Sequence, residues 1–339
     1  MAPLPLAVVA NLGLRQYWAL VLTFISAGVI GAAAVLLGLV DAAVGVVDPR
    51  AAASSGSQGA PALIVCGAFA LAALLPAVRV WLSRAVPLDP ESPVHLVALV
   101  LTLSLVGLQL QSAFSGALSQ EAGSAQPLGK ADLVAGEIPF LLAAVVGVGL
   151  FVRRGGWEAA QRLGYSRPVW WHVALAVAAA GLFYAIGVGM DALGQYLTPG
   201  TAKEVSSATN RIFGQLTVNP GGVATIAITA GICEEALFRG ALQPRLGILW
   251  TSIVFASVHT QYGLSFDALA VLILAIGLGL LRRFLSTTVS TVSHVSYDLL
   301  AGFGLGSAAL PWAGAAEAGL VALLGGAFLV HLRRRSPAA

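Results

Sequence analysis

Apolar stretches long enough to cross a lipid bilayer recur along the whole of this sequence. A transmembrane helix needs about 20 predominantly apolar residues. Ten candidates lie at residues 17–40, 61–82, 94–115, 134–152, 169–192, 219–240, 247–261, 264–281, 287–306 and 313–332. Four of these are short or polar, namely 134–152, 247–261, 264–281 and 287–306. The pattern predicts an all-α, polytopic transmembrane bundle of about eight to ten helices.

The composition excludes most soluble proteins. Charged residues make up 10% of the chain and hydrophobic residues 58%, whereas a soluble domain carries about 25% charged residues. The longest polar connections span only roughly 20 to 30 residues, so we expect no soluble domain. A cytosolic enzyme, a nucleic-acid-binding protein and a disordered chain are all excluded, and no nucleic-acid partner is expected.

Basic residues sort to one side when the chain is threaded through the membrane from a cytoplasmic N-terminus. On that path, 14 of the 18 lysines and arginines fall in cytoplasmic segments. The four on the other side are Arg50, Lys130, Lys203 and Arg211. Cytoplasmic connections are enriched in Lys and Arg, so we expect both termini to be cytoplasmic. Eight helices with two re-entrant or peripheral pieces would give the same parity.

Few ionisable side chains lie inside the apolar stretches. Each costs about 2.5–3.5 kcal/mol to insert, so such residues mark functional sites by default. They are Glu234, Glu235, Arg239, His259, His294 and Asp298. Asp267 and Glu317 lie inside predicted spans, near the start of each. Every other charged residue lies near a predicted helix end or in a connection.

Three of these positions reach the same depth in the membrane. Glu234 precedes Arg245 by 11 residues, and His294 follows Arg283 by 11, so each lies about 16 Å from the cytoplasmic end at 1.5 Å per residue. His259 lies about 18 Å past the turn that ends at Gly247. We therefore expect these three residues to form one site.

Helix periodicity separates the two adjacent glutamates. Glu235 and Arg239 are four residues apart and share a helix face, so they can form an ion pair. Glu234 is turned by about 100° from Glu235 and need not share that arginine. Glu234 is therefore available for chemistry.

The same four-residue spacing places His294 beside Asp298, and Phe255 beside His259. A carboxylate with a neighbouring histidine can hold and deprotonate a water molecule. A second histidine, oriented by a carbonyl or carboxylate group, can stabilise the oxyanion of a tetrahedral intermediate. These groups favour peptide hydrolysis by activated water. The set Glu234, His259 and His294 could also hold Zn²⁺ with one open position.

Three motifs on successive apolar stretches resemble the CPBP family, which contains CAAX proteases and bacteriocin-processing (Abi-type) membrane proteins. They are Glu-Glu-x-x-x-Arg at 234–239, Phe-x-x-x-His at 255–259 and His-x-x-x-Asp at 294–298. The resulting division is 1–156, N-terminal transmembrane helices of unassigned role; 157–306, the protease-like core that the resemblance covers; and 307–339, a C-terminal transmembrane helix with a basic tail.

The resemblance implies an intramembrane endopeptidase of the glutamate type. By it, Glu234 would activate water with His259, and His294 with Asp298 would form the oxyanion site. Prenyl-protein proteases usually have Asn where this chain has Asp298, and an ionised Asp cannot donate a hydrogen bond. We therefore assign the oxyanion role to His294 and expect Asp298 to orient it. Phe255 is expected to support the site.

The expected substrate is a membrane-embedded or lipid-modified peptide. A non-catalytic immunity or scaffolding protein of the same family is the main alternative. A transporter with a Glu and His proton relay is a third, although no repeat halves are visible. The resemblance favours a mechanism without a metal cofactor, with zinc as the alternative, and no H-E-x-x-H spacing occurs.

The amino-acid composition indicates the type of organism from which the chain comes. The chain is rich in Ala, Val, Leu, Gly and Arg and poor in Lys, which indicates a GC-rich bacterial genome. We therefore expect an integral protein of a bacterial plasma (inner) membrane.

Overall fold

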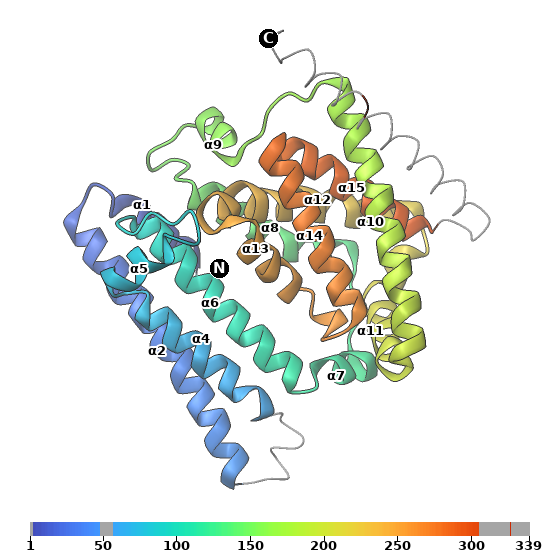
Figure 1. Cartoon of the computed structure of the whole chain (residues 1–339), viewed down its shortest axis with the longest axis horizontal. Coiled ribbons are helices and arrows are strands. Elements are labelled where there is room, and N and C mark those ends of the chain that lie inside the picture. Colours follow the sequence, from blue (N-terminus) through green and yellow to red (C-terminus); the bar gives the residue numbers. More distant parts are fainter. Residues whose placement is uncertain (1–2, 48–56, 305–325, 327–339) are drawn as a thin grey trace, which may run out of the picture.

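The computed structural model describes residues 3–47, 57–304 and 326, and these residues are almost entirely helical (Figure 1). The helices are α1 (Pro3–Leu12), α2 (Tyr17–Val47), α4 (Ala60–Ala72), α5 (Pro76–Leu82), α6 (Pro93–Phe114), α7 (Ala117–Ser124), α8 (Lys130–Gly147), α9 (Gly156–Leu163), α10 (Trp170–Leu197), α11 (Pro199–Thr217), α12 (Pro220–Glu235), α13 (Gln243–Ser257), α14 (Phe266–Phe284) and α15 (Thr287–Phe303). A π-helical segment, η2 (Ala236–Leu242), joins α12 to α13, and short 3-10 turns lie at η1 (Ser57–Gly59) and η3 (Thr260–Tyr262). The described residues contain no β-strand, and the all-α class is confirmed.

Among the residues that the structure describes, four apolar helical stretches are long enough to cross a membrane, judged by length and composition. Three are α2, α6 and α10, and the fourth is the continuous stretch Pro220–Ser257, which contains α12, η2 and α13. Helices α4 and α5 add a fifth crossing if they count as one span, although they are bent by 105° relative to each other. The chain is therefore a polytopic integral membrane protein.

The remaining predicted spans within the described residues are also helices, but they are shorter or more polar. Helix α8 contains Lys130, Asp132 and Glu137, and α15 has only 17 residues, many of them Ser or Thr. Such helices can lie at membrane depth where neighbouring helices cover their polar faces. The predicted span at 313–332 lies outside the described residues.

The helices form two groups that lie side by side (Figure 1). In the first, α2, α4 and α6 pack on one another. In the second, α15 packs against α10, α12 and α14, and α12 also packs against α8. Helix α13 packs against α14 of the second group and also contacts α6 of the first, so it joins the two groups. The polar helix α15 thus lies inside the second group.

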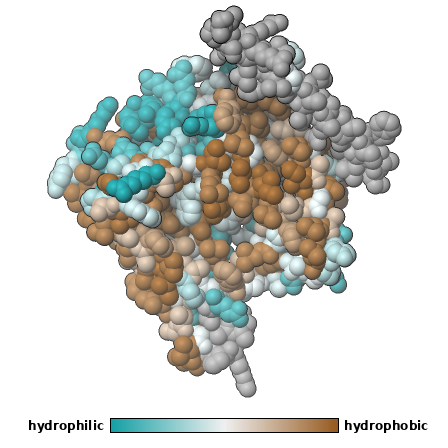
Figure 2. All heavy atoms as spheres, in the orientation of Figure 1, coloured by the Kyte–Doolittle hydropathy of each residue, from teal (hydrophilic) through white to brown (hydrophobic). Residues whose placement is uncertain are grey.

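The outer helices face a lipid-like environment. Only 22% of the most apolar window of α2, and likewise of α10, is buried inside the molecule. Figure 2 shows apolar side chains over the flank of the molecule, while hydrophilic side chains gather at the end that carries α9. This distribution is that of a bundle whose sides contact acyl chains and whose ends contact water.

The connection after α10 differs from its sequence interpretation as a polar loop, because most of it is the amphipathic helix α11. Its buried residues are Ala202, Val205, Ala208 and Leu216, while charged residues such as Lys203 and Arg211 are exposed. The apolar positions recur every three to four residues, which is the helical period. No long apolar run marks this helix, so a search for spans passes over it.

Arginines from separate connections meet at the hydrophilic end. Burial lowers the pKa of Arg162 on α9, and repulsion from Arg154 and Arg282 lowers it further. Arg153 likewise interacts with Arg15 and Arg162. These residues were predicted to share the cytoplasmic side, and the structure brings them together at one end. The assignment of that end to the cytoplasm stays a prediction.

Candidate functional site

The first motif lies where helix α12 changes to the π-helical segment η2. At the start of α12, Asn219 accepts a hydrogen bond from the Gly222 backbone N–H at 2.8 Å, and Pro220 is the first helical residue, which is a typical helix start. At its end, Glu234 and Glu235 are 6% and 0% exposed. π-helical turns within α-helices are frequent at functional sites, and this one follows the two buried carboxylates directly.

Glu235 and Arg239 form the ion pair that their spacing predicts. The Glu235 Oε2 atom lies 3.5 Å from Arg239 Nε, and both side chains are completely buried. The Arg239 guanidinium carbon also lies 4.8 Å from the centre of the Phe255 ring, which allows a cation–π contact. The arginine charge is therefore committed to Glu235 and Phe255.

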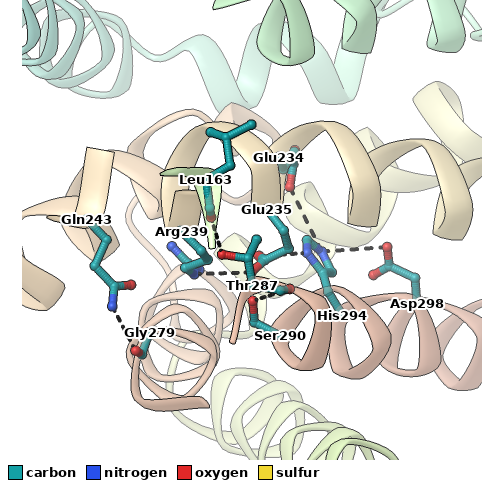
Figure 3. Close-up of polar contacts among 10 residues, drawn as sticks. All are labelled: Leu163, Glu234, Glu235, Arg239, Gln243, Gly279, Thr287, Ser290, His294 and Asp298. Carbon is teal, nitrogen blue, oxygen red and sulfur yellow. Dashed lines mark hydrogen bonds and ion pairs between the residues drawn. The ribbon is translucent and has the colours of Figure 1, made fainter. Parts of the chain in front are cut away.

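His294 lies among three carboxylates (Figure 3). Its Nδ1 atom is 3.1 Å from Glu235 Oε1. Its Nε2 atom lies 3.6 Å from Asp298 Oδ2 and 3.9 Å from Glu234 Oε2. Because a carboxylate accepts hydrogen bonds, Nδ1 is a donor to Glu235. The sequence expectation gave Asp298 alone as the orienting group, and the structure adds Glu235 at a shorter distance.

His259 follows the end of α13, and its orientation is set by the preceding helical turn. Its Nδ1 atom lies 2.9 Å from the backbone oxygen of Phe255, which fixes Nδ1 as the donor. In a neutral ring the Nε2 atom then carries the lone pair. The Phe255 ring centre lies 4.8 Å from that of His259 and 5.8 Å from that of His294, so Phe255 packs between the two histidines.

A cavity of about 340 Å³ joins these groups. Glu234, His259, His294 and Asp298 all line it. The depth argument, which predicted one site from three separate helices, agrees with this arrangement. No lysine or arginine occurs among the described residues that line the cavity.

The cavity extends away from the arginine-rich end of the molecule. Helix α15 starts at that end, where the Thr287 backbone N–H donates to the Gly164 oxygen at 3.0 Å. Gly302, which lines the far part of the cavity, is 15 residues further along, or about 22 Å. The lining likewise runs back along α12 from Glu234 to Val223. The cavity thus extends from the site in the direction opposite to the arginines.

Residues 218–300 match a family model described as Type II CAAX prenyl endopeptidase Rce1-like. This segment contains all the motif residues, from Glu234 to Asp298. This segment is similar to the Rce1-like family. No curated protein and no solved structure matches the chain in the corresponding comparisons.

The resemblance to CAAX proteases is confirmed for this domain. At the level of the family, the match supports an intramembrane endopeptidase and a membrane-associated peptide substrate. The Rce1-like domain lies within the predicted core at 157–306, whose outer boundaries stay a prediction.

A further carboxylate, which the sequence reasoning missed, lines the cavity of the Rce1-like domain. Glu137 on α8 lines the same cavity as Glu234, although α8 precedes the domain in the chain. The predicted span began at residue 134, so Glu137 was interpreted as a residue near a helix end. The helix starts at Lys130, which places Glu137 two turns inside it. The Gly129–Lys130 boundary and the capping residue Asp132 were the signals that could have shown this.

Close helix packing positions the two sides of the domain. Gly231 on α12 faces Val295 on α15, and a Cβ atom at residue 231 would lie only 2.5 Å from Val295 Cγ2. At the start of α15, the Thr287 hydroxyl donates to the Leu163 oxygen at 2.5 Å. These contacts fix the height of α15 against α12, and hence of His294 against the two glutamates.

The fit of a metal ion can be judged from the donor atoms. No group of three or more His, Cys, Asp or Glu residues in the described part of the chain has an arrangement that could hold a metal ion. His294 Nδ1 is engaged by Glu235, and His259 Nδ1 by a backbone oxygen. These contacts leave the Nε2 atom of each histidine for other partners, and we derive no step through a metal.

Proposed function

We propose that this chain is an intramembrane endopeptidase that hydrolyses a peptide bond of a membrane-embedded or lipid-modified substrate. The observation that carries the proposal is the meeting of Glu234, His259 and His294 at one cavity within the Rce1-like domain. With a volume of about 340 Å³, the cavity has room for a water molecule beside these groups. Buried polar groups that face such a cavity are the typical setting of acid–base catalysis.

In the proposed reaction, Glu234 is the general base. A water molecule is held between the Glu234 carboxylate and the Nε2 lone pair of His259, which is free because Nδ1 donates to the Phe255 oxygen. Glu234 takes one proton from this water, and the water oxygen bonds to the carbonyl carbon of the substrate. A tetrahedral intermediate with an oxyanion results.

His294 stabilises this oxyanion in the proposal. Its Nδ1 atom donates to Glu235 at 3.1 Å, so the ring must be protonated for Nε2 to be directed toward the cavity as a second donor. Asp298, on the next turn of α15, lies 3.6 Å from Nε2 and orients the ring. When the intermediate collapses, the carbon–nitrogen bond breaks and the leaving nitrogen takes up a proton. The water proton taken by Glu234 balances this transfer.

We further propose that the reaction needs no metal and that the chain resides in the inner membrane of a bacterium with a GC-rich genome. The arginine-rich end and both termini would face the cytoplasm. The support is the positive-inside distribution of the sequence and the meeting of Arg15, Arg153, Arg154 and Arg162 at one end.

The proposal is tested with the isosteric variant Glu234→Gln in the native membrane. Membrane proteins from cells that carry the wild type, Glu234→Gln or a deletion are compared for changes in peptide termini. We expect termini that depend on the wild type and are missing in Glu234→Gln and in the deletion. Purified protein in proteoliposomes should then cleave a synthetic peptide that spans such a terminus, and His259→Ala should also be inactive.

Asp191→Asn is the matched control, because Asp191 is an exposed carboxylate on α10 that does not line the cavity. It should retain full cleavage. If Glu234→Gln complements the deletion strain as well as the wild type does, the non-catalytic alternative is correct and the protease proposal is wrong.

A further inference from the structure

Glu137 gives the cavity an additional carboxylate that the proposed reaction does not yet use. Its Oε2 atom is buried and has no hydrogen-bond partner among the described residues. Glu234 Oε2 is in the same condition. The two residues line the cavity from different helices, α8 and α12, which pack against each other. Glu137 also lies within electrostatic range of Glu234, His294 and Asp298.

A purely structural glutamate at this depth would be expected to have a partner. Buried carboxylates in bundles are normally paired with a cation or hydrogen-bonded, because an unpaired buried polar group is costly. Glu235 is such a residue, since Arg239 and His294 both contact it. Glu137 Oε2 has no comparable contact in the described structure. This difference points to a ligand or a reacting group as its partner.

The charges around the cavity do not balance if every carboxylate is ionised. The titratable groups that line it are Glu137 on α8, Glu234 on α12, His259 and Tyr262 after α13, and His294, Tyr297 and Asp298 on α15. Helix α11 contributes Thr209, Phe213 and Thr217, none of which titrates. Two carboxyl groups that face one cavity inside a helical bundle tend to share a proton, because like charges there repel.

We propose that Glu137 is the general acid that protonates the leaving nitrogen, while Glu234 is the base. The inference rests on the proposed function, and it gives the two carboxyl groups opposite roles. Glu234 removes a proton from water as the oxygen–carbon bond forms. Glu137 then gives its proton to the amide nitrogen as the carbon–nitrogen bond breaks. Transfer of the water proton from Glu234 to Glu137, directly or through a water molecule, restores both groups.

The decisive measurement is the cleavage of matched amide and ester substrates by Glu137→Gln in proteoliposomes. An amide nitrogen must be protonated before it leaves, whereas an ester oxygen leaves far more easily. General acid catalysis contributes roughly 10²–10⁴-fold. We therefore expect kcat for the amide to fall by about 100-fold or more, kcat for the ester by less than about 10-fold, and KM to change little. Glu234→Gln should lose both activities.

The pH profile gives an independent readout. In the wild type, kcat for the amide should decline at high pH, where the acid has lost its proton. In Glu137→Gln the part of this decline that comes from Glu137 should be lost, because glutamine does not titrate, so the decline should move to higher pH. A residue that only supports the fold would leave the shape of this profile unchanged.

Asp132→Asn is the control on the same helix, because Asp132 is exposed at the start of α8 and does not line the cavity. Equal losses on amide and ester, or an unchanged high-pH decline in Glu137→Gln, would overturn the inference. If Glu137→Gln does not fold, Glu137→Leu takes its place because it also removes the acid, and an unchanged amide-to-ester ratio overturns the inference in the same way.

The two proposals fail in different ways. An active wild type, an inactive Glu234→Gln and a fully active Glu137→Gln contradict only the role of Glu137. Full activity in Glu234→Gln contradicts the proposed function itself.

Discussion

The ion pair between Glu235 and Arg239 predicts a separation of stability from activity. Both side chains are completely buried, with 3.5 Å between Oε2 and Nε. At an effective dielectric constant of about 20, two unit charges at that distance attract by about 5 kcal/mol. Removing one partner of such a pair costs roughly 3–5 kcal/mol, since it leaves an uncompensated charge in the interior. We expect this loss in the free energy of unfolding for Arg239→Met.

Removing both charges should recover much of that loss. In the double variant Glu235→Gln, Arg239→Met, no unpaired charge of the pair is left, and replacing a buried ion pair by uncharged side chains is often nearly neutral. The coupling energy of the double-mutant cycle should therefore exceed about 2 kcal/mol. Activity should not recover, because Glu235→Gln removes the negative charge that lies 3.1 Å from His294 Nδ1, and a neutral acceptor holds the ring less strongly.

The assay is reversible unfolding of the purified protein in lipid bicelles, with peptide cleavage measured on the same samples. The four members of the cycle are compared at one lipid composition. A double variant as unstable as Arg239→Met alone would refute the reasoning on the ion pair. A double variant with wild-type cleavage would refute the proposed positioning of His294 by Glu235.

Three further outcomes are expected. Gly231→Leu should lower the free energy of unfolding by about 1–3 kcal/mol and should also lower cleavage, since even a Cβ atom at residue 231 would lie 2.5 Å from Val295 Cγ2. Gly123→Leu is the control and should change neither quantity, because a Cβ atom at residue 123 would have no neighbouring atom within 4 Å. Exhaustive chelation with EDTA and 1,10-phenanthroline should leave peptide cleavage unchanged, and loss that zinc restores would contradict the metal-free proposal. A membrane-impermeant thiol reagent applied to intact cells should label Lys203→Cys and not Arg167→Cys, and the opposite labelling would reverse the proposed orientation.

The long apolar helices could be predicted from sequence because their signal is local. Helices α2, α6 and α10 correspond to predicted spans, and each is apolar enough to cross a membrane by itself. The adjacency of Glu235 and Arg239 is equally local, since it follows from a four-residue spacing on one helix. The predicted meeting of Glu234, His259 and His294 needed only the depth of each residue from a helix end.

The contacts that the sequence did not predict are all between helices distant in the chain. Glu235 was interpreted as the partner of Arg239 alone, and its hydrogen bond to His294 spans 59 residues. Glu137 belongs to a helix whose start was placed four residues too late, which moved the residue from the interior to the end. Depth and periodicity give the height and the face of a residue on its own helix, and they do not give the rotation of that helix against its neighbours.

Helix α15 shows why composition alone misjudges the most important element of the site. With 17 residues, many of them Ser or Thr, it would be a poor span in contact with lipid. Its surroundings change that result, because α10, α12 and α14 pack around it, and Ser290, Ser293 and His294 are buried. The Ser290 hydroxyl donates to the Thr287 oxygen at 3.0 Å, so it is satisfied within the helix. A helix that is polar and nevertheless enclosed by apolar neighbours is the place where an active site can exist inside a bilayer, because water and peptide can reach the polar groups without exposing them to acyl chains.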